Sequence, residues 1–253
     1  MKVATDVRLC KNFLPQQLDK CTWFGDNKDY AFINLDDKAV VKNVIELYKK
    51  LLSQGYKIED IQVLSSYKKG DHGAGIINNG IQKVANPNYG SENYIKVGDT
   101  VYFKGDLVIQ NVNNYHAKLF INDNYVWDND DTEHKKNETF IANGETGIIT
   151  EVTSFYVIIN FDGVSVKYSR EELQNVGLGY CITIHKSQGS SSKVIILVTP
   201  KAHTYMLNSN LIYVGLTRMR EKCFHLGNSH TVEQAIKKKA NFSRNTLMQR
   251  FLI

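Results

Sequence analysis

The 253-residue sequence predicts an α/β domain that is interrupted by a small β-barrel. Strands, polar loops and amphipathic helices alternate in residues 1–95 and again in residues 175–253, as expected for an open sheet with helices on its faces. Residues 96–174 instead hold short strands with tight turns, which are typical of a small barrel. We therefore expect the two outer segments to form one split domain around an inserted barrel.

The first α/β part is expected to contain two strands and two helices, after an entry segment without clear periodicity. Tyr30–Asn34 alternates as a strand does, and the short apolar run Ile61–Leu64 predicts a second strand. Apolar residues recur at three- and four-residue spacing from Lys38 to Leu52, which predicts an amphipathic helix. A second helix is expected over Ala74–Ala85, because Asn86-Pro87 would end it.

Five short strands are expected in the barrel: Val97–Phe103, Leu107–Gln110, Thr146–Val152, Phe155–Phe161 and Val164–Tyr168. Asn143-Gly144 and Asp162-Gly163 mark tight turns, and the second pair is a strong hairpin signal. Asn122–Glu138 carries six acidic side chains against Lys135 and Lys136, which predicts a long, mobile surface loop. We expect such a loop to repel DNA.

The second α/β part resumes the alternation of strands and helices. Its expected elements are a strand at Gly179–Ile184, a buried strand at Val194–Val198, a helix at Ser209–Met219, an edge strand at Cys223–Leu226 and two helical stretches after His230.

Positive charge is concentrated at the C-terminal end. Residues 201–253 hold nine basic and two acidic side chains, whereas residues 1–200 hold 22 basic and 24 acidic ones. A basic C-terminal segment suits an anionic partner such as a nucleic-acid backbone. Lys237–Lys239 by itself is better explained as the solvated face of a terminal helix.

The cysteines and the hydropathy pattern indicate a cytoplasmic protein. The four cysteines are widely spaced and form no C-x-x-C pair, which argues against a zinc site and for a reducing cytosol. No apolar run reaches the roughly 20 residues needed to cross a membrane. The N-terminus lacks the apolar core of a signal peptide.

Two polar motifs stand out in the second α/β part. Thr183–Gly189 (TIHKSQG) opens directly into an apolar strand. Tyr213–Arg220 (YVGLTRMR) reads as an amphipathic helical stretch with Arg218 and Arg220 on its polar side. Together they resemble motifs V and VI of superfamily 1 DNA helicases, closest to the RecD-like branch with its UvrD-like C-terminal domain. The pair in this order and spacing is a stronger signal than either motif alone.

The resemblance extends over almost the whole chain. Asp60–Gly70 and the helix after it look like the start of the second motor domain, and Lys96–Tyr102 and Ala142–Ile148 look like the first strands of its barrel. The implied fold is a RecA-like, P-loop-type second motor domain, a parallel sheet with flanking helices, interrupted by a small Src-homology-3-like β-barrel. The sequence contains no G-x-x-x-x-G-K-[ST] loop and no acidic strand end suited to magnesium.

The resemblance implies that Thr183, His185 and Lys186 face the DNA backbone, with Ser65 and Lys68 as weaker candidates on the same path. Hydroxyl and cationic groups suit a motor that grips phosphates without reading bases. The alternative for Thr183 and His185 is a hydrogen-bonded junction between strand and turn that has no ligand.

The resemblance also implies that Gln188, Gly189 and Arg218 face a nucleotide. Arg218 would be the catalytic arginine finger, because a planar, permanently charged guanidinium suits the charge that develops on a γ-phosphate. Ser190–Ser192 departs from the family, in which a glutamate often follows this glycine by two residues. Arg220 is left open between a supporting contact and an ordinary helix-surface charge.

The sequence therefore predicts the C-terminal domain of an ATP-dependent DNA helicase, as found in DNA repair and recombination. It would bind single-stranded DNA and share a nucleotide cleft with an N-terminal P-loop motor domain, on the same chain or a separate one. ATP and Mg belong to the complete motor; this chain alone is expected to bind no cofactor tightly and to lack ATPase activity. One alternative is a free-standing single-stranded nucleic-acid-binding module. Another is a degenerate structural partner, against which the intact Lys186, Gln188 and Arg218 argue.

Overall fold

Residues 2–120 and 137–238 are described by a computed structural model, and the chain divides into two units. The first unit contains Met1–Val44, Gln62–Ala74 and Thr183–Ile253, and the second contains Ile45–Ile61 and Gly75–Ile182. Each unit is described by itself below.

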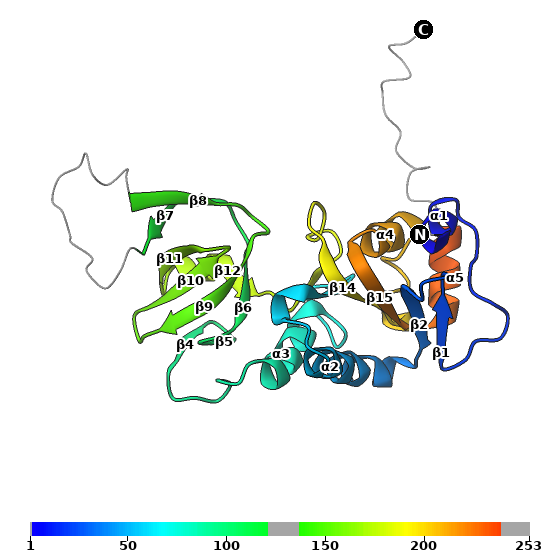
Figure 1. The fold of residues 1–253 in the computed structure, drawn as a ribbon, viewed down its shortest axis with the longest axis horizontal. Helices are drawn as coiled ribbons and strands as arrows, with labels where there is room; N and C mark the ends of the chain where they lie inside the picture. The colour runs from blue at the N-terminus through cyan, green and yellow to red at the C-terminus, as the bar shows by residue number, and fades with distance from the viewer. Residues whose placement is uncertain (1, 121–136, 239–253) are drawn as a thin grey trace, which may run out of the picture. The chain divides into compact units, whose positions relative to one another are not determined.

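A mixed six-stranded sheet has the order β1-β2-β15-β14-β3-β13. Figure 1 labels β1, β2, β14 and β15 of this sheet. Its strands are β1 (Cys21–Phe24), β2 (Tyr30–Asn34), β3 (Ile61–Ser65), β13 (Cys181–Thr183), β14 (Ser192–Thr199) and β15 (Met219–Gly227). β15 runs parallel to both of its neighbours, β14 and β2, whereas β1 is antiparallel to β2. All five residues of β3 and the last six of β14 are buried, as expected for strands covered on both faces.

The five α-helices of the described residues are α1 (Lys2–Arg8), α2 (Asp37–Ser53), α3 (Ala74–Ala85), α4 (Ser209–Leu216) and α5 (Ser229–Lys237). The predictions of α2 and α3 from apolar spacing are confirmed. Asparagine caps begin the last two helices. The side-chain oxygen of Asn208 accepts from Leu211 N at 2.9 Å, and that of Asn228 accepts from Thr231 N at 3.1 Å.

Two predictions in the second α/β part are wrong. The helix expected over Ser209–Met219 ends at Leu216, because Thr217 Oγ1 and Arg218 Nε both donate to Val214 O and satisfy an end carbonyl of α4. Met219 then begins β15, so Arg220 lies on a strand and not on a helix. The strand expected at the sheet edge, Cys223–Leu226, belongs to β15, which lies between β2 and β14.

The entry segment has more structure than its periodicity suggested, since it contains α1 and β1. At the other end, α5 accounts for the first of the two helical stretches expected after His230. The second stretch, with Lys239, lies outside the described residues.

The second unit contains an antiparallel sheet of seven strands, in the order β12-β6-β9-β10-β11-β7-β8, and the hairpin β4-β5. The strands are β4 (Tyr94–Val97), β5 (Thr100–Phe103), β6 (Leu107–Gln110), β7 (Asn114–Leu119), β8 (Glu138–Ile141), β9 (Thr146–Val152), β10 (Tyr156–Phe161), β11 (Val164–Ser169) and β12 (Val176–Leu178). The hairpin predicted from Asp162-Gly163 is confirmed, and both turn residues have positive φ, 47° and 92°.

Five strands of this unit differ from the prediction. The single strand expected at Val97–Phe103 is the end of β4 together with β5, because Gly98 turns the chain at φ 59°. β7, β8 and β12 were not predicted at all. The acidic segment Asn122–Glu138 mostly lies outside the described residues, although Glu138 begins β8.

A buried carboxylate ties several elements of the second unit together. Asp106 is fully buried and accepts hydrogen bonds from Gln82, Asn86, Tyr180 and the Phe103 amide, at 2.7–2.9 Å. Burial raises the pKa of Asp106, and the hydrogen bonds oppose that rise. This one side chain links α3 to the β5–β6 turn and to the segment that precedes β13.

Three 3₁₀ turns complete the described chain: Ile58–Asp60, Glu172–Asn175 and Lys201–His203. No helix of the described residues is long and apolar enough to cross a membrane.

Candidate functional site

The turn formed by Thr183–Gly189 begins where β13 ends. Ile184 N donates to Ser65 O at 3.0 Å, which joins the start of the turn to the end of β3. Thr183 Oγ1 accepts from Lys186 N at 3.3 Å, and Ser187 Oγ donates to Ile184 O at 2.7 Å. The Thr183 hydroxyl and the buried Ser187 thus give the turn a defined shape.

Two of the predicted DNA-facing residues form a basic pair. Burial, and then the nearby charge of Lys68, lower the pKa of the half-buried Lys186 to about 8. His185 and Lys68 are exposed. Because two ammonium groups repel each other, a phosphate close to both would be held by each and would relieve their repulsion.

Ser65 occupies a different kind of position. Its side chain is fully buried, and its hydroxyl donates to His72 O at 3.0 Å. The hydroxyl therefore holds the loop after β3, and the structure supports Ser65 as a residue that shapes this surface.

The same loop packs on a histidine that sequence reasoning did not single out. The rings of Tyr67 and His203 are 4.9 Å apart, and His203 is only 3% exposed. Burial, and then the neighbouring His72, lower the pKa of His203 to about 4. Its Nδ1 has no hydrogen-bond partner among the described residues. A single histidine between Ala202 and Thr204 gave no sequence signal for this burial.

The predicted nucleotide-facing residues lie at the other end of the turn. Gln188 and Gly189 are exposed, and Gly189 has φ 92°, a conformation that side chains with a Cβ rarely adopt. Arg218 joins this end of the turn, because its Nη1 donates to Ser190 O at 3.1 Å and its main-chain O accepts from Ser192 N at 3.0 Å.

Three contacts fix the guanidinium of Arg218. Besides the bond to Ser190 O, Nε donates to Val214 O and Nη2 donates to Thr217 Oγ1, both at 3.1 Å. A guanidinium carries five N–H donors in a planar fork. Arg218 is half-buried, so a preorganised and permanently charged donor group remains within reach of an anionic ligand.

The turn separates the two groups of predicted residues. Thr183, Lys186 and Lys68 gather after the ends of β13 and β3. Arg218 contacts Ser190, the residue after Gly189, where the parallel strands β14 and β15 begin. One short segment thus has one end suited to a phosphate backbone and another suited to a small polyanion.

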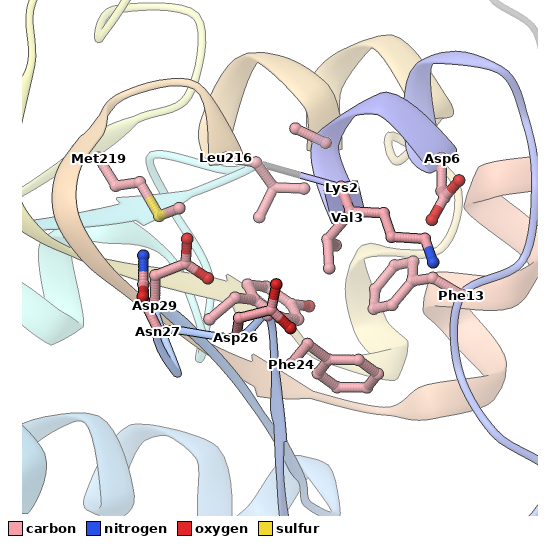
Figure 2. Close-up of a pocket in the computed structure, with 13 residues that line it drawn as sticks. Lys2, Val3, Asp6, Phe13, Phe24, Asp26, Asn27, Asp29, Leu216 and Met219 are labelled. Carbon is pink, nitrogen blue, oxygen red and sulfur yellow. The ribbon is translucent and has the colours of Figure 1, made fainter.

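A separate cavity of about 530 Å³ lies beside the end of α4 in the first unit. Figure 2 shows carboxylates of the β1–β2 turn and Lys2 of α1 around the same hollow. Leu216 and Met219 line it, and the predicted site residues are not among its thirteen lining residues.

The comparisons with known proteins agree with the sequence resemblance. Residues 178–224 match the family model of the UvrD-like helicase C-terminal domain, a range that contains both motifs. The ATP-dependent RecD2 DNA helicase of Deinococcus radiodurans is 28% identical over 190 residues, which are 75% of this chain and 23% of that protein. Residues 178–224 therefore resemble the C-terminal domain of superfamily 1 helicases.

A further curated protein and a solved structure are also similar to this chain. The RecBCD enzyme subunit RecD of Buchnera aphidicola from Acyrthosiphon pisum is 26% identical over 198 residues, covering 73% of this chain and 29% of that subunit. A structure of Bacteroides Pif1 helicase in complex with ADP-AlF3 and ssDNA is 18% identical with a TM-score of 0.42, covering 80% of this chain and 51% of that one. The chain spans about a quarter of the length of the curated relatives.

Proposed function

We propose that this chain is the C-terminal motor half of an ATP-dependent DNA helicase. In this proposal residues 1–95 and 175–253 form the RecA-like second motor domain, and residues 96–174 form an inserted Src-homology-3-like barrel. The other half of the motor is an N-terminal P-loop domain, on the same chain or a separate one, which supplies the phosphate cradle and the magnesium ligands. The homologous RecD2 and RecD proteins support the proposal.

The observation that carries the proposal is the restraint of Arg218. A guanidinium fixed at Nε, Nη1 and Nη2 needs little rearrangement to meet charge that develops on a transferring phosphoryl group. The side chain would act on a nucleotide held by the P-loop domain, with Gln188 and Gly189 beside it. Arginine fingers of this kind accelerate phosphoryl transfer by roughly a thousandfold or more.

The DNA strand would pass the other end of the turn. Lys186 and Lys68 would bind backbone phosphates, with Thr183 and His185 beside them. Because these groups contact phosphates and not base edges, binding would tolerate any sequence and weaken with salt. The turn Thr183–Gly189 would then connect the DNA contact to the nucleotide contact through a few hydrogen-bonded residues.

The test is complementation by a P-loop motor domain encoded with this chain. DNA-stimulated ATP hydrolysis is measured for the chain alone, for the P-loop domain alone and for the two together. We expect turnover only from the combination. Robust turnover by the purified chain alone would overturn the two-domain motor. Single-stranded DNA binding without any stimulation of a P-loop domain would favour the free-standing binding module.

A further inference from the structure

The start of β15 contains a bulge at Arg220–Glu221. Ser192 pairs with Met219 and Val194 pairs with Lys222, so two residue steps on β14 face three steps on β15. A bulge of this kind re-aims the side chains at the extra residue. Arg220 and Glu221 are both exposed, and the bulge therefore directs Arg220 toward the turn that precedes β14.

Arg220 and Arg218 are tied to consecutive residues of that turn. Arg220 Nε donates to Ser191 Oγ at 2.8 Å, and Arg218 Nη1 donates to Ser190 O at 3.1 Å. Gly189 comes immediately before, with φ 92° and no atom within 4 Å of where a Cβ would lie. The two guanidiniums thus lie next to an open stretch of main chain, which a ligand can approach.

The charge of this surface favours an anion with more than one phosphate. Residues 186–193 and 217–222 hold five basic side chains and one acidic one, Glu221. Arg220 forms no ion pair with Glu221 in the part of the chain that the structure describes. Arg218 and Arg220 are hydrogen-bonded to adjacent residues of one turn, and holding two positive charges near each other is unfavourable without a counter-charge. A single phosphate can neutralise one guanidinium, whereas a polyphosphate chain can reach both.

We propose that Arg220 is a second phosphate-binding residue, which acts with Arg218 and the Gly189–Ser191 turn to hold two neighbouring phosphates of a polyphosphate chain such as that of a nucleoside triphosphate. The identification of the ligand as a nucleotide rests on the proposed function. The polyphosphate site itself rests on the bulge, the two tethers and the local charge. The Ser191 hydroxyl positions Arg220, because it accepts a hydrogen bond from Arg220 Nε.

The test uses inorganic tripolyphosphate, pyrophosphate and phosphate as probes of this chain at low salt. Affinities are measured by calorimetry, and the Nε–H resonances of Arg218 and Arg220 are followed by NMR. Tripolyphosphate should bind most tightly and shift both resonances. Arg220→Gln should weaken tripolyphosphate binding about tenfold or more, as expected for loss of a charge-assisted contact, with a smaller effect on phosphate. Arg220→Lys should restore part of the loss, and Ser191→Ala should cause a smaller loss than Arg220→Gln.

The matched control is Lys83→Gln, which removes one exposed positive charge from α3. Equal losses in Lys83→Gln and Arg220→Gln would show that only net charge matters and would overturn the proposal. So would an absence of tripolyphosphate binding, or binding that shifts resonances at Lys68 and Lys186 instead. A loss of tripolyphosphate affinity in Arg218→Ala but not in Arg220→Gln would show that Arg220 is not part of the site. The proposed helicase function would be unaffected by that result, because the ATPase measurement tests it separately.

Discussion

Acidification should destabilise the first unit through two buried histidines. His225 is fully buried between Tyr30 OH and Thr199 Oγ1, each 2.7 Å from a ring nitrogen. Burial lowers the pKa of His225 to about 3 and, together with His72, lowers that of His203 to about 4. The fold therefore favours the neutral rings, whereas the unfolded chain takes up protons near pH 6.5, the ordinary histidine pKa.

The size of the effect follows from these pKa values. Because the unfolded state binds more protons, stability must fall as pH falls through the ordinary pKa and continue to fall toward the lowered ones. Between about pH 7.5 and about pH 5, each histidine should remove about 2 kcal/mol from the free energy of unfolding, or about 4 kcal/mol together. That is a large part of the roughly 5–15 kcal/mol that stabilises a typical domain.

Urea unfolding followed by far-ultraviolet circular dichroism at several pH values measures this difference. His225→Gln should reduce the pH-dependent loss by about half, whatever its effect on stability at neutral pH. His230→Gln is the matched control, because it removes an exposed histidine of α5. A free energy of unfolding that does not change over this pH range, or an unchanged slope in His225→Gln, would refute the assignment of neutral buried rings.

Three further predictions address the other parts of the chain. Lys186→Ala should weaken single-stranded DNA binding equally across base sequences and reduce the slope of log affinity against log salt by about 0.7, measured by fluorescence anisotropy; a loss confined to one base sequence would contradict a phosphate contact. Asp106→Asn should lower the free energy of unfolding by about 1–3 kcal/mol in urea titrations, because the N–H groups of the new amide would face the N–H and O–H groups that now donate to the carboxylate. An unchanged free energy of unfolding would show that this buried network contributes nothing to stability. Gly189→Ala should lower tripolyphosphate affinity by straining the turn, since φ is 92° there, and an unchanged affinity would show that the turn conformation does not matter.

Short sequence patterns predicted the elements that depend on residues close to one another in the chain. α2 and α3 follow from apolar spacing and a proline stop, and the β10–β11 hairpin follows from Asp162-Gly163. The end of α4 did not follow, because Thr217 and Arg218 cap it with side-chain bonds to Val214 O that spacing does not reveal. The interior place of β15 depends on its pairing with β2, almost two hundred residues earlier, which no window of sequence contains.

In the candidate site, too, some features were predicted from the sequence and others were not. The resemblance assigned Gly189 and Arg218 to one nucleotide, and in the structure Arg218 contacts Ser190, the residue after Gly189. It assigned Lys186 and, more weakly, Lys68 to one DNA path, and the charge of Lys68 is close enough to lower the pKa of Lys186. Ser65 was predicted as a surface contact, but its hydroxyl is buried against His72 O. Arg220 was assigned to a helix, and only the pairing register of β14 with β15 reveals the bulge that directs it to Ser191.

The restraint of Arg218 is the central feature of the helicase proposal, and single-turnover hydrolysis of saturating ATP by the complete motor tests it most directly. Arg218→Ala should slow the chemical step by about a thousandfold and leave single-stranded DNA affinity close to normal, because the charge stabilises the transition state more than the bound substrate. Arg218→Lys should recover little of the rate, since an ammonium cannot reproduce the planar fork. An unchanged hydrolysis rate in Arg218→Ala, with folding and ATP binding intact, would contradict the proposal.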